Sequence, residues 1–278
     1  MYSIQTASFE QVKIMLDWAR QEGWNPGLDD AKNFQLVDPN GFFIGSLDDK
    51  PVAAISNVSY GDKLFFLGLY IVHPEYRGQG LGYQIWQHAM NYTGQINCGL
   101  DGVVAQQANY MKSGFKLAYR NIRYAIKENL QSAFQSVELV ILNNLLLDAV
   151  LDYDQRLFPA PRKNWLMAWV LNHTTLVYCK DNQIMGYGVI RRCHVGYKIG
   201  PLFANNQQVA EDIFQGLCAK VELGAEIYLD IPEPNLQALK LVENFNMQAV
   251  FETARMYTQH APEVNLDKIF GVTTFELG

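Results

Sequence analysis

The chain has 278 residues, of which 49% are hydrophobic and 18% are charged, and its formal net charge is −6. This length allows one large domain or two ordinary ones with packed cores, and the composition argues against intrinsic disorder. Proteins that bind nucleic acids usually carry a basic face. An acidic chain without a block of basic residues is therefore expected to bind no nucleic acid.

The cysteines are widely spaced and form no C-x-x-C pair. Without a cluster of histidines they predict no metal site, and we expect buried thiols in a reducing compartment. No secretory signal is present, and no apolar run reaches the ~20 residues that a membrane helix needs. We therefore expect a cytoplasmic protein that binds neither a metal nor a membrane. The cysteines are Cys98, Cys179, Cys193 and Cys218.

The first half of the chain alternates between strand and helix patterns. A strand over 2–6 precedes a helix that Ser8 can cap and that glycines over 23–27 can end. The order of elements predicts an α+β sheet covered by helices, which closes a first domain near Lys127. The further expected elements are a helix over 29–36, strands over 41–47, 51–60 and 64–72, a helix from the next glycine turn, a strand over 98–105, a helix over 106–113 and a strand over 115–126.

The second half repeats this order. Gly68 to Val72 corresponds in position to Gly200 to Ala204, and Gly99 to Asp101 corresponds to Tyr228 to Asp230. We therefore predict two tandem domains of the same fold, over 1–127 and 128–278. The expected elements are helices over 145–158 and 163–171, strands over 175–179, 184–192 and 195–203, a helix over 207–223, a strand over 226–231, a helix over 235–245 and a strand over 247–259.

The most informative stretch is a glycine-rich turn that follows an apolar strand and opens a helix. It reads Arg77-Gly78-Gln79-Gly80-Leu81-Gly82. Free backbone amides and the helix dipole make such a turn a cradle for phosphate. A P-loop requires Lys and Ser or Thr after the glycines, but Tyr83 and Gln84 follow here. A dinucleotide-binding fold requires G-x-G-x-x-G at the start of a βαβ unit, whereas this turn follows an antiparallel meander.

The pattern Val72-x-Pro74-x-x-Arg77-Gly78-x-Gly80-x-Gly82 resembles the coenzyme A signature of the GNAT N-acetyltransferase superfamily. The order of elements around it is similar to that fold. The resemblance covers the first half and extends weakly to the second, so the chain is similar to tandem GNAT proteins. It implies that acetyl-coenzyme A is the co-substrate and that amides from Arg77 to Gly82 hold its pyrophosphate. It also implies that the main chain of Ile71 and Val72 pairs with the pantetheine arm.

The same resemblance places Tyr110 near the coenzyme sulfur and Asn109 beside the pantetheine arm. A phenol with a pKa of ~10 stays protonated at neutral pH and can donate to a departing thiolate. The attacking amine must be neutral, which requires a proton acceptor. Asp101 is the first candidate for this acceptor, with Glu22 and His73 behind it.

Each of these residues also has a purely structural interpretation. The ring of Tyr110 can pack on the sheet, and Asp101 can cap a turn or pair with a basic residue. Trp24, which lies at the end of the first expected helix, can belong to the core rather than to the wall of an acceptor pocket.

The second half lacks the features expected of an active site. The segment over 204–210 has neither a glycine turn nor an arginine, and Val242 stands where Tyr110 stands in the first half. We therefore expect one active site. The second domain would shape the acceptor pocket, with Asp230 and Glu233 as candidate contacts.

We predict an N-acetyltransferase that moves an acetyl group from acetyl-coenzyme A to a primary amine by direct attack in a ternary complex. No cysteine stands in a motif position, which argues against a covalent acyl-enzyme. The expected partner is a small-molecule amine, with a protein amine as the alternative, and the expected state is a monomer or homodimer. A non-catalytic sensor of acyl-coenzyme A is the alternative function. The tail over 270–277 is compatible with packing on either domain.

Overall fold

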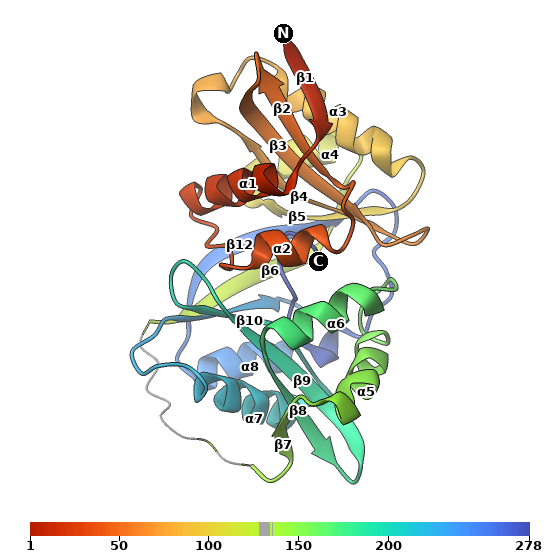
Figure 1. The fold of residues 1–278 in the computed structure, drawn as a ribbon. Coiled ribbons are helices and arrows are strands. Elements are labelled where there is room, and N and C mark those ends of the chain that lie inside the picture. The colour runs from red at the N-terminus through yellow and green to blue at the C-terminus, as the bar shows by residue number, and fades with distance from the viewer. Residues whose placement is uncertain (128–133, 135) are drawn as a thin grey trace.

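The computed structural model describes residues 1–127, 134 and 136–278. The first residues of the predicted second domain, 128–133 and 135, lie outside the described residues. Figure 1 shows two halves stacked one above the other, with strands running across the level at which they meet.

The first half follows the predicted order of elements. Ser8 caps the first helix, because its hydroxyl accepts from the Gln11 amide at 3.3 Å while the Gln11 side chain accepts from the Ser8 amide at 2.9 Å. The predicted strand over 98–105 ends early, at Val103, where a 3-10 turn over Val104–Gln106 begins. The elements are β1 (Tyr2–Thr6), α1 (Phe9–Gln21), α2 (Asp30–Gln35), β2 (Phe42–Leu47), β3 (Lys50–Ser59), β4 (Phe65–Val72), α3 (Leu81–Thr93), β5 (Cys98–Val103), α4 (Gln107–Lys112) and β6 (Lys116–Ile126), with a further 3-10 turn over Pro74–Tyr76.

The second half also keeps the predicted order, with two short strands added. Strands β7 and β13 have three residues each, which is too few for a hydrophobic period to reveal them. The predicted helix over 207–223 ends earlier, at Cys218. The elements are β7 (Leu139–Ile141), α5 (Asn144–Asp154), α6 (Lys163–Asn172), β8 (Thr174–Lys180), β9 (Gln183–Arg192), β10 (Tyr197–Ala204), α7 (Gln207–Cys218), β11 (Ile227–Pro232), α8 (Leu236–Asn244), β12 (Gln248–Tyr257), a 3-10 turn (Leu266–Lys268) and β13 (Ile269–Gly271).

The strands form one 13-stranded sheet that runs through both halves. Its order is β1-β2-β3-β4-β5-β12-β6-β11-β10-β9-β8-β7, and β13 pairs with β10. The last long strand of the second half, β12, lies between β5 and β6, and β6 in turn pairs with β11. Figure 1 shows β6 and β12 crossing the middle of the molecule. The halves have thus exchanged their last strands, so the predicted boundary near Lys127 does not separate two sheets.

Side chains alternate between the two faces of the sheet. Both faces carry apolar side chains, and helices cover both. Helices α3 and α4 pack with Ile55 and Phe65 in one core of the first half, and α7 and α8 pack in a separate core of the second half. The core under α1 and α2 is shared with α5 and α6. There Trp165 donates its ring N–H to the Asn33 carbonyl at 2.8 Å. The shared sheet and this shared core fix the halves relative to each other.

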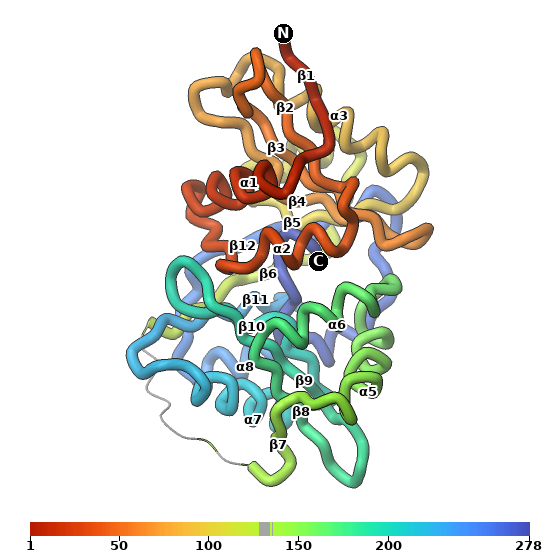
Figure 2. The backbone as a smooth tube through the Cα atoms, viewed as in Figure 1, coloured from red at the N-terminus to blue at the C-terminus, as the bar shows by residue number. Residues whose placement is uncertain are grey.

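The C-terminal tail contacts both halves. Gly271 in β13 pairs with Leu202 in β10 of the second half. Farther on, the Leu277 carbonyl accepts from the Tyr60 hydroxyl of the first half at 2.9 Å. Figure 2 shows the chain ending near the middle of the molecule, beside α2. The tail therefore crosses from its own half to the other.

Candidate active site

Strands β4 and β5 lie side by side only at their beginnings. Their parallel pairing runs from Phe65 with Cys98 to Leu67 with Leu100. A bulge then turns β4 away: its register against β3 shifts, and Leu69 has a φ of 47°, which L residues adopt rarely. Within the described residues no strand pairs with this edge of β4 beyond Leu67. The strands thus enclose a wedge with backbone polar groups along one side.

A cavity of about 500 Å³ fills this wedge. It is lined by β4, β5, the glycine turn, the end of α1, β12 and the C-terminal tail. Gln79 and Asn109 do not line it: the Gln79 side-chain amide donates to the Glu75 carbonyl at 3.3 Å, and the Asn109 side-chain amide donates to the Gln106 side chain at 2.7 Å. The predicted role of Gln79 concerns its backbone amide, which this side-chain bond does not engage. The predicted site residues that do line the cavity are Trp24, Ile71, Val72, Arg77, Gly78, Gly80, Leu81, Gly82, Asp101 and Tyr110.

The glycine turn leaves its backbone open to a ligand. Gly78 and Gly80 both have a φ of 77°, and a Cβ at either would meet no atom of the described residues within 4 Å. Helix α3 begins after Gly80 without a side-chain cap, so its first amides remain available to an anion. The Arg77 guanidinium bonds the Val72 carbonyl at 2.9 Å and pairs with Glu22. Arg77 thereby ties the turn to β4 and to the end of α1.

Tyr110 is held against β5 by close packing. Its ring stacks on Trp86 with centroids 5.6 Å apart, and a Cβ at Gly102 would lie 2.2 Å from the tyrosine Cε2. Burial, together with nearby Tyr70, raises the pKa of Tyr110 to about 12. The phenol is therefore protonated at neutral pH and can act as a hydrogen-bond or proton donor at the cavity wall.

Asp101 lines the cavity, but its carboxylate is already fully engaged. Arg255, its cross-strand partner in β12, donates to both oxygens at 2.8 and 2.6 Å. Asn121 adds a third bond at 2.8 Å, and the aspartate side chain is 0% exposed. Protonation of Asp101 would leave the buried Arg255 without its counter-charge. The structure therefore argues against the predicted role of Asp101 as proton acceptor.

Asp230 occupies the corresponding place in the second half and is paired in the same way. Arg123 of β6 donates to its two oxygens at 2.6 and 2.8 Å. Burial acts to raise the pKa of Asp230, but Arg123, together with Lys198 and Arg191, outweighs it and lowers that pKa. Asp230 does not line the cavity, which contradicts the predicted contact with the acceptor. His73 also lies outside it, with its ring beside Trp18 and Tyr76.

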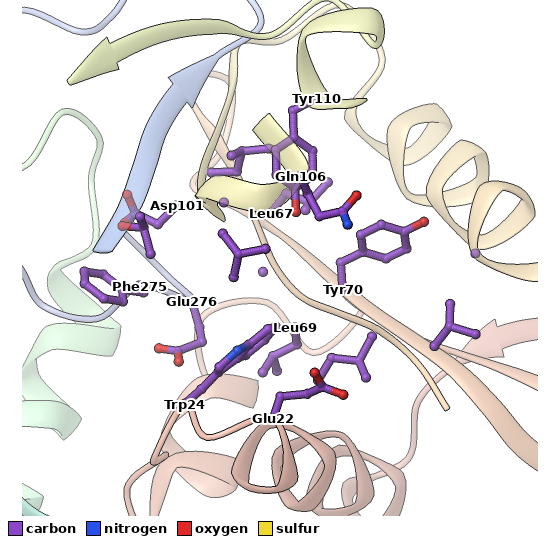
Figure 3. A pocket seen from close by; sticks show the side chains of 18 of the residues that line it. Glu22, Trp24, Leu67, Leu69, Tyr70, Asp101, Gln106, Tyr110, Phe275 and Glu276 are labelled. Atoms are coloured by element: carbon purple, nitrogen blue, oxygen red, sulfur yellow. The ribbon is translucent and has the colours of Figure 1, made fainter. Parts of the chain in front are cut away.

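Aromatic side chains form one part of the cavity wall. Trp24 after α1, Phe251 of β12 and Phe275 of the tail line it, and Figure 3 shows Trp24 and Phe275 there with Glu276 beside them. Arg123 supports this wall, because it donates to the Trp24 carbonyl at 2.9 Å and lies 4.8 Å from the Phe275 ring centroid. Phe251, Phe275 and Glu276 were not predicted from the sequence, since no motif marks them and they reach the first half only through the exchanged strand and the tail.

The second half forms the same wedge, but fills it with protein. Strands β10 and β11 pair only from Tyr197–Ile227 to Ile199–Leu229, after which β13 lies along β10. A Cβ at Gly271 would be 2.6 Å from Leu229 Cδ1, so β13 fits closely between the two strands.

The second half also lacks the glycine cradle and the tyrosine. The Asn206 side chain caps α7 by accepting from the Val209 amide at 3.1 Å. Val242 matches Tyr110: its carbonyl accepts from Met247 at 2.9 Å, as that of Tyr110 accepts from Phe115 at 3.1 Å. These observations support one site in the first half.

The comparisons with known proteins agree with this fold. Residues 2–115 match the Acetyltransferase (GNAT) family, and residues 150–271 match an Acetyltransferase (GNAT) domain. The holothin acyltransferase of Pseudoalteromonas sp. (strain SANK 73390) is 32% identical to this chain, over 100% of the chain and 95% of that protein. The chain belongs to the GNAT acyltransferase family.

Solved structures show the same architecture as this GNAT acyltransferase. A protein from Pyrococcus horikoshii assigned as an acetyltransferase superposes with a TM-score of 0.84 at 24% identity, covering 100% of this chain and 96% of that one. A tandem GNAT protein from the clavulanic acid biosynthesis pathway superposes with a TM-score of 0.63 at 9% identity, covering 94% and 100%. At these identities the likeness concerns the fold. The predicted tandem GNAT architecture is confirmed.

In residues 1–127, 134 and 136–278, no helix is long and apolar enough to cross a membrane. Across the same residues, no group of three or more His, Cys, Asp or Glu side chains is arranged to hold a metal ion.

Proposed function

We propose that this GNAT acyltransferase transfers an acetyl group from acetyl-coenzyme A to a primary amine of a small molecule by direct attack in a ternary complex. The observation that carries the proposal is the open wedge between β4 and β5 beside the glycine turn. A pyrophosphate needs several N–H donors and no particular side chain, which suits Gly78 and Gly80. The amides of a pantetheine arm can pair with the free edge of β4 beyond Leu67.

The residues around the wedge supply the remaining requirements of acyl transfer. Acetyl-coenzyme A, when bound, provides the activated acetyl group. Tyr110 has a raised pKa and so keeps its proton until a thiolate departs. Arg77 bonds to β4 and pairs with the residue after α1, which fixes the position of the glycine turn in the cavity wall.

The acceptor is proposed to bind on the aromatic side of the cavity. Trp24, Phe251 and Phe275 form a wall with flat apolar surfaces, which favours an amine that carries a flat apolar body. Because the full-length relative is a holothin acyltransferase, holothin belongs among the first acceptors to test.

The decisive experiment is an acceptor screen that follows thiol release from acetyl-coenzyme A. The panel contains holothin, arylalkyl amines, amino acids, polyamines and lysine peptides, and reactions without amine measure hydrolysis. We expect amine-dependent thiol release with a small amine and the matching N-acetyl product by mass spectrometry. Acetylation of peptides alone, or no amine-dependent release with any acceptor, would refute the proposal.

A further inference from the structure

Glu276 is a buried carboxylate on the cavity wall without a close polar partner. Glu276 as a whole is 4% exposed and lines the cavity. Its backbone amide donates to Thr274 at 3.2 Å, but within residues 1–127, 134 and 136–278 its side chain makes no hydrogen bond and no ion pair shorter than 4.0 Å. The other cavity carboxylates are engaged, Glu22 with Arg77 and Asp101 with Arg255. The carboxylate oxygens of Glu276 remain accessible from the cavity, so a ligand can reach them.

A cluster of buried basic residues lies near Glu276. Arg123 of β6, Arg191 of β9 and Lys198 of β10 all interact electrostatically with it. Asp230 pairs with Arg123 and Asp30 pairs with Arg191, which leaves one of these three cations without a carboxylate partner. Lys198 instead donates to the Asn25 carbonyl at 3.0 Å. Glu276 forms an ion pair with none of them, so its protonation, unlike that of Asp101, would break no ion pair.

The tail holds Glu276 at the apex of the wedge. A Cβ at Gly68 would lie 2.6 Å from the Glu276 carbonyl oxygen, so the tail backbone rests on the first residue of β4 beyond its pairing with β5. The Tyr60 bond to Leu277 anchors the next residue. Figure 3 shows the Glu276 carboxylate beside the rings of Trp24 and Phe275. Trp24, Phe275 and Glu276 therefore line one cavity, which an acceptor amine can enter.

We propose that Glu276 is the proton acceptor of acyl transfer and that the acceptor amine lies against Trp24 and Phe275. This assignment rests on the proposed function. The nitrogen lone pair forms the new C–N bond as the thioester C–S bond breaks. The proton lost by nitrogen goes to Glu276, and the departing thiolate takes the proton of Tyr110. Water then returns both residues to their starting states, and the net products are an amide and a free thiol.

The test is Glu276→Gln, which keeps the size of the side chain and removes its basicity. The probe reaction is acetyl-coenzyme A with phenethylamine, a primary amine with a flat apolar ring, or with a faster amine from the screen. We expect kcat to fall about 100-fold or more, while the Kd for acetyl-coenzyme A by calorimetry stays within about twofold of wild type. The acid limb of the kcat profile, which reports the enzyme–substrate complex rather than the free amine, should be present in wild type and absent in the variant.

Asp230→Asn is the matched control. It removes a negative charge from the same buried cluster at a residue that does not line the cavity. We expect a lower thermal midpoint but an unchanged acid limb. A Glu276→Gln enzyme with wild-type kcat and a wild-type acid limb would overturn the assignment, and so would a loss explained wholly by weaker acetyl-coenzyme A binding.

A second variant covers the case in which Glu276→Gln does not fold. Glu276→Asp keeps the charge but withdraws the carboxylate by one methylene, and we expect at least a tenfold fall in kcat with the acid limb retained. Wild-type turnover in this variant would overturn the assignment. A wild-type protein that acetylates no amine defeats the proposed function, whereas active wild type with equally active Glu276 variants defeats only the role of Glu276.

Discussion

The two halves form the same wedge and use it differently. Between β4 and β5 the wedge is a cavity, whereas between β10 and β11 it holds β13 of the same chain. A strand segment in the second half thus takes the place proposed for a pantetheine arm in the first. The fold therefore opens the wedge in both halves, and the segment next to it decides whether a ligand can enter.

The halves also share a feature that is unrelated to the open site. Asp101 pairs with Arg255, and Asp230 pairs with Arg123, each across adjacent strands from different halves. The second half keeps this ion pair although β13 fills its wedge. We therefore interpret both pairs as contacts that hold the exchanged strands together. This interpretation explains why a carboxylate at the cavity wall need not take part in proton transfer.

The largest expected difference between the halves concerns acetyl-coenzyme A binding. Gly80→Asp places a carboxylate in the phosphate cradle at a φ of 77°, so we expect calorimetry to show no binding. Asn206→Asp changes the cap of α7, and binding should persist at one site per chain. Two equivalent tight sites in wild type, or binding retained by Gly80→Asp, would contradict a single acetyl-coenzyme A site in the first half.

Tyr110→Phe tests whether Tyr110 is catalytic. In the second half Val242 stands at the corresponding place. Loss of the proton donor should lower kcat by about 10²–10⁴-fold while the Kd for acetyl-coenzyme A stays near wild type. Tyr178→Phe, at a buried tyrosine of β8 outside the cavity, is the control and should keep wild-type turnover. Equal kcat in both variants would remove Tyr110 from the mechanism.

Arg255→Ala and Arg123→Ala test the two buried ion pairs between the exchanged strands. Each leaves a buried carboxylate without its counter-charge, so the free energy of unfolding should fall by about 3–5 kcal/mol in both variants. The lowered pKa of Asp230 means that its pair stabilises the fold fully above the ordinary carboxyl pKa of ~4 and loses this effect as the pH falls through the lower folded pKa. Denaturant titrations at pH 7 and pH 3 measure both effects; destabilisation by only one variant would argue against equivalent roles.

Gly271→Val tests how closely β13 fits its wedge. The added side chain would press on Leu229, and overpacking of this kind costs about 1–3 kcal/mol. Asp267→Ala, at an exposed residue just before β13, should change stability by less than ~0.5 kcal/mol. Thermal unfolding of both variants measures the difference, and equal midpoints would mean that the wedge is loosely filled.

The local features of this protein could be predicted from its sequence. The glycine turn, the order of elements, the Ser8 cap and the replacement of Tyr110 by Val242 are legible because each depends on residues close in the chain. The resemblance based on these features led to the correct family.

Tertiary structure alone decided the rest. The partner of Asp101 is 154 residues away, the last strands change places between the halves, and the tail brings Phe275 and Glu276 to a cavity formed by the first half. Hydrophobic periodicity shows that a strand exists and which face it buries, but strand partners are chosen by long-range packing and by buried charge pairs. The acceptor side of the site depends on those partners, so it became visible only in the folded chain.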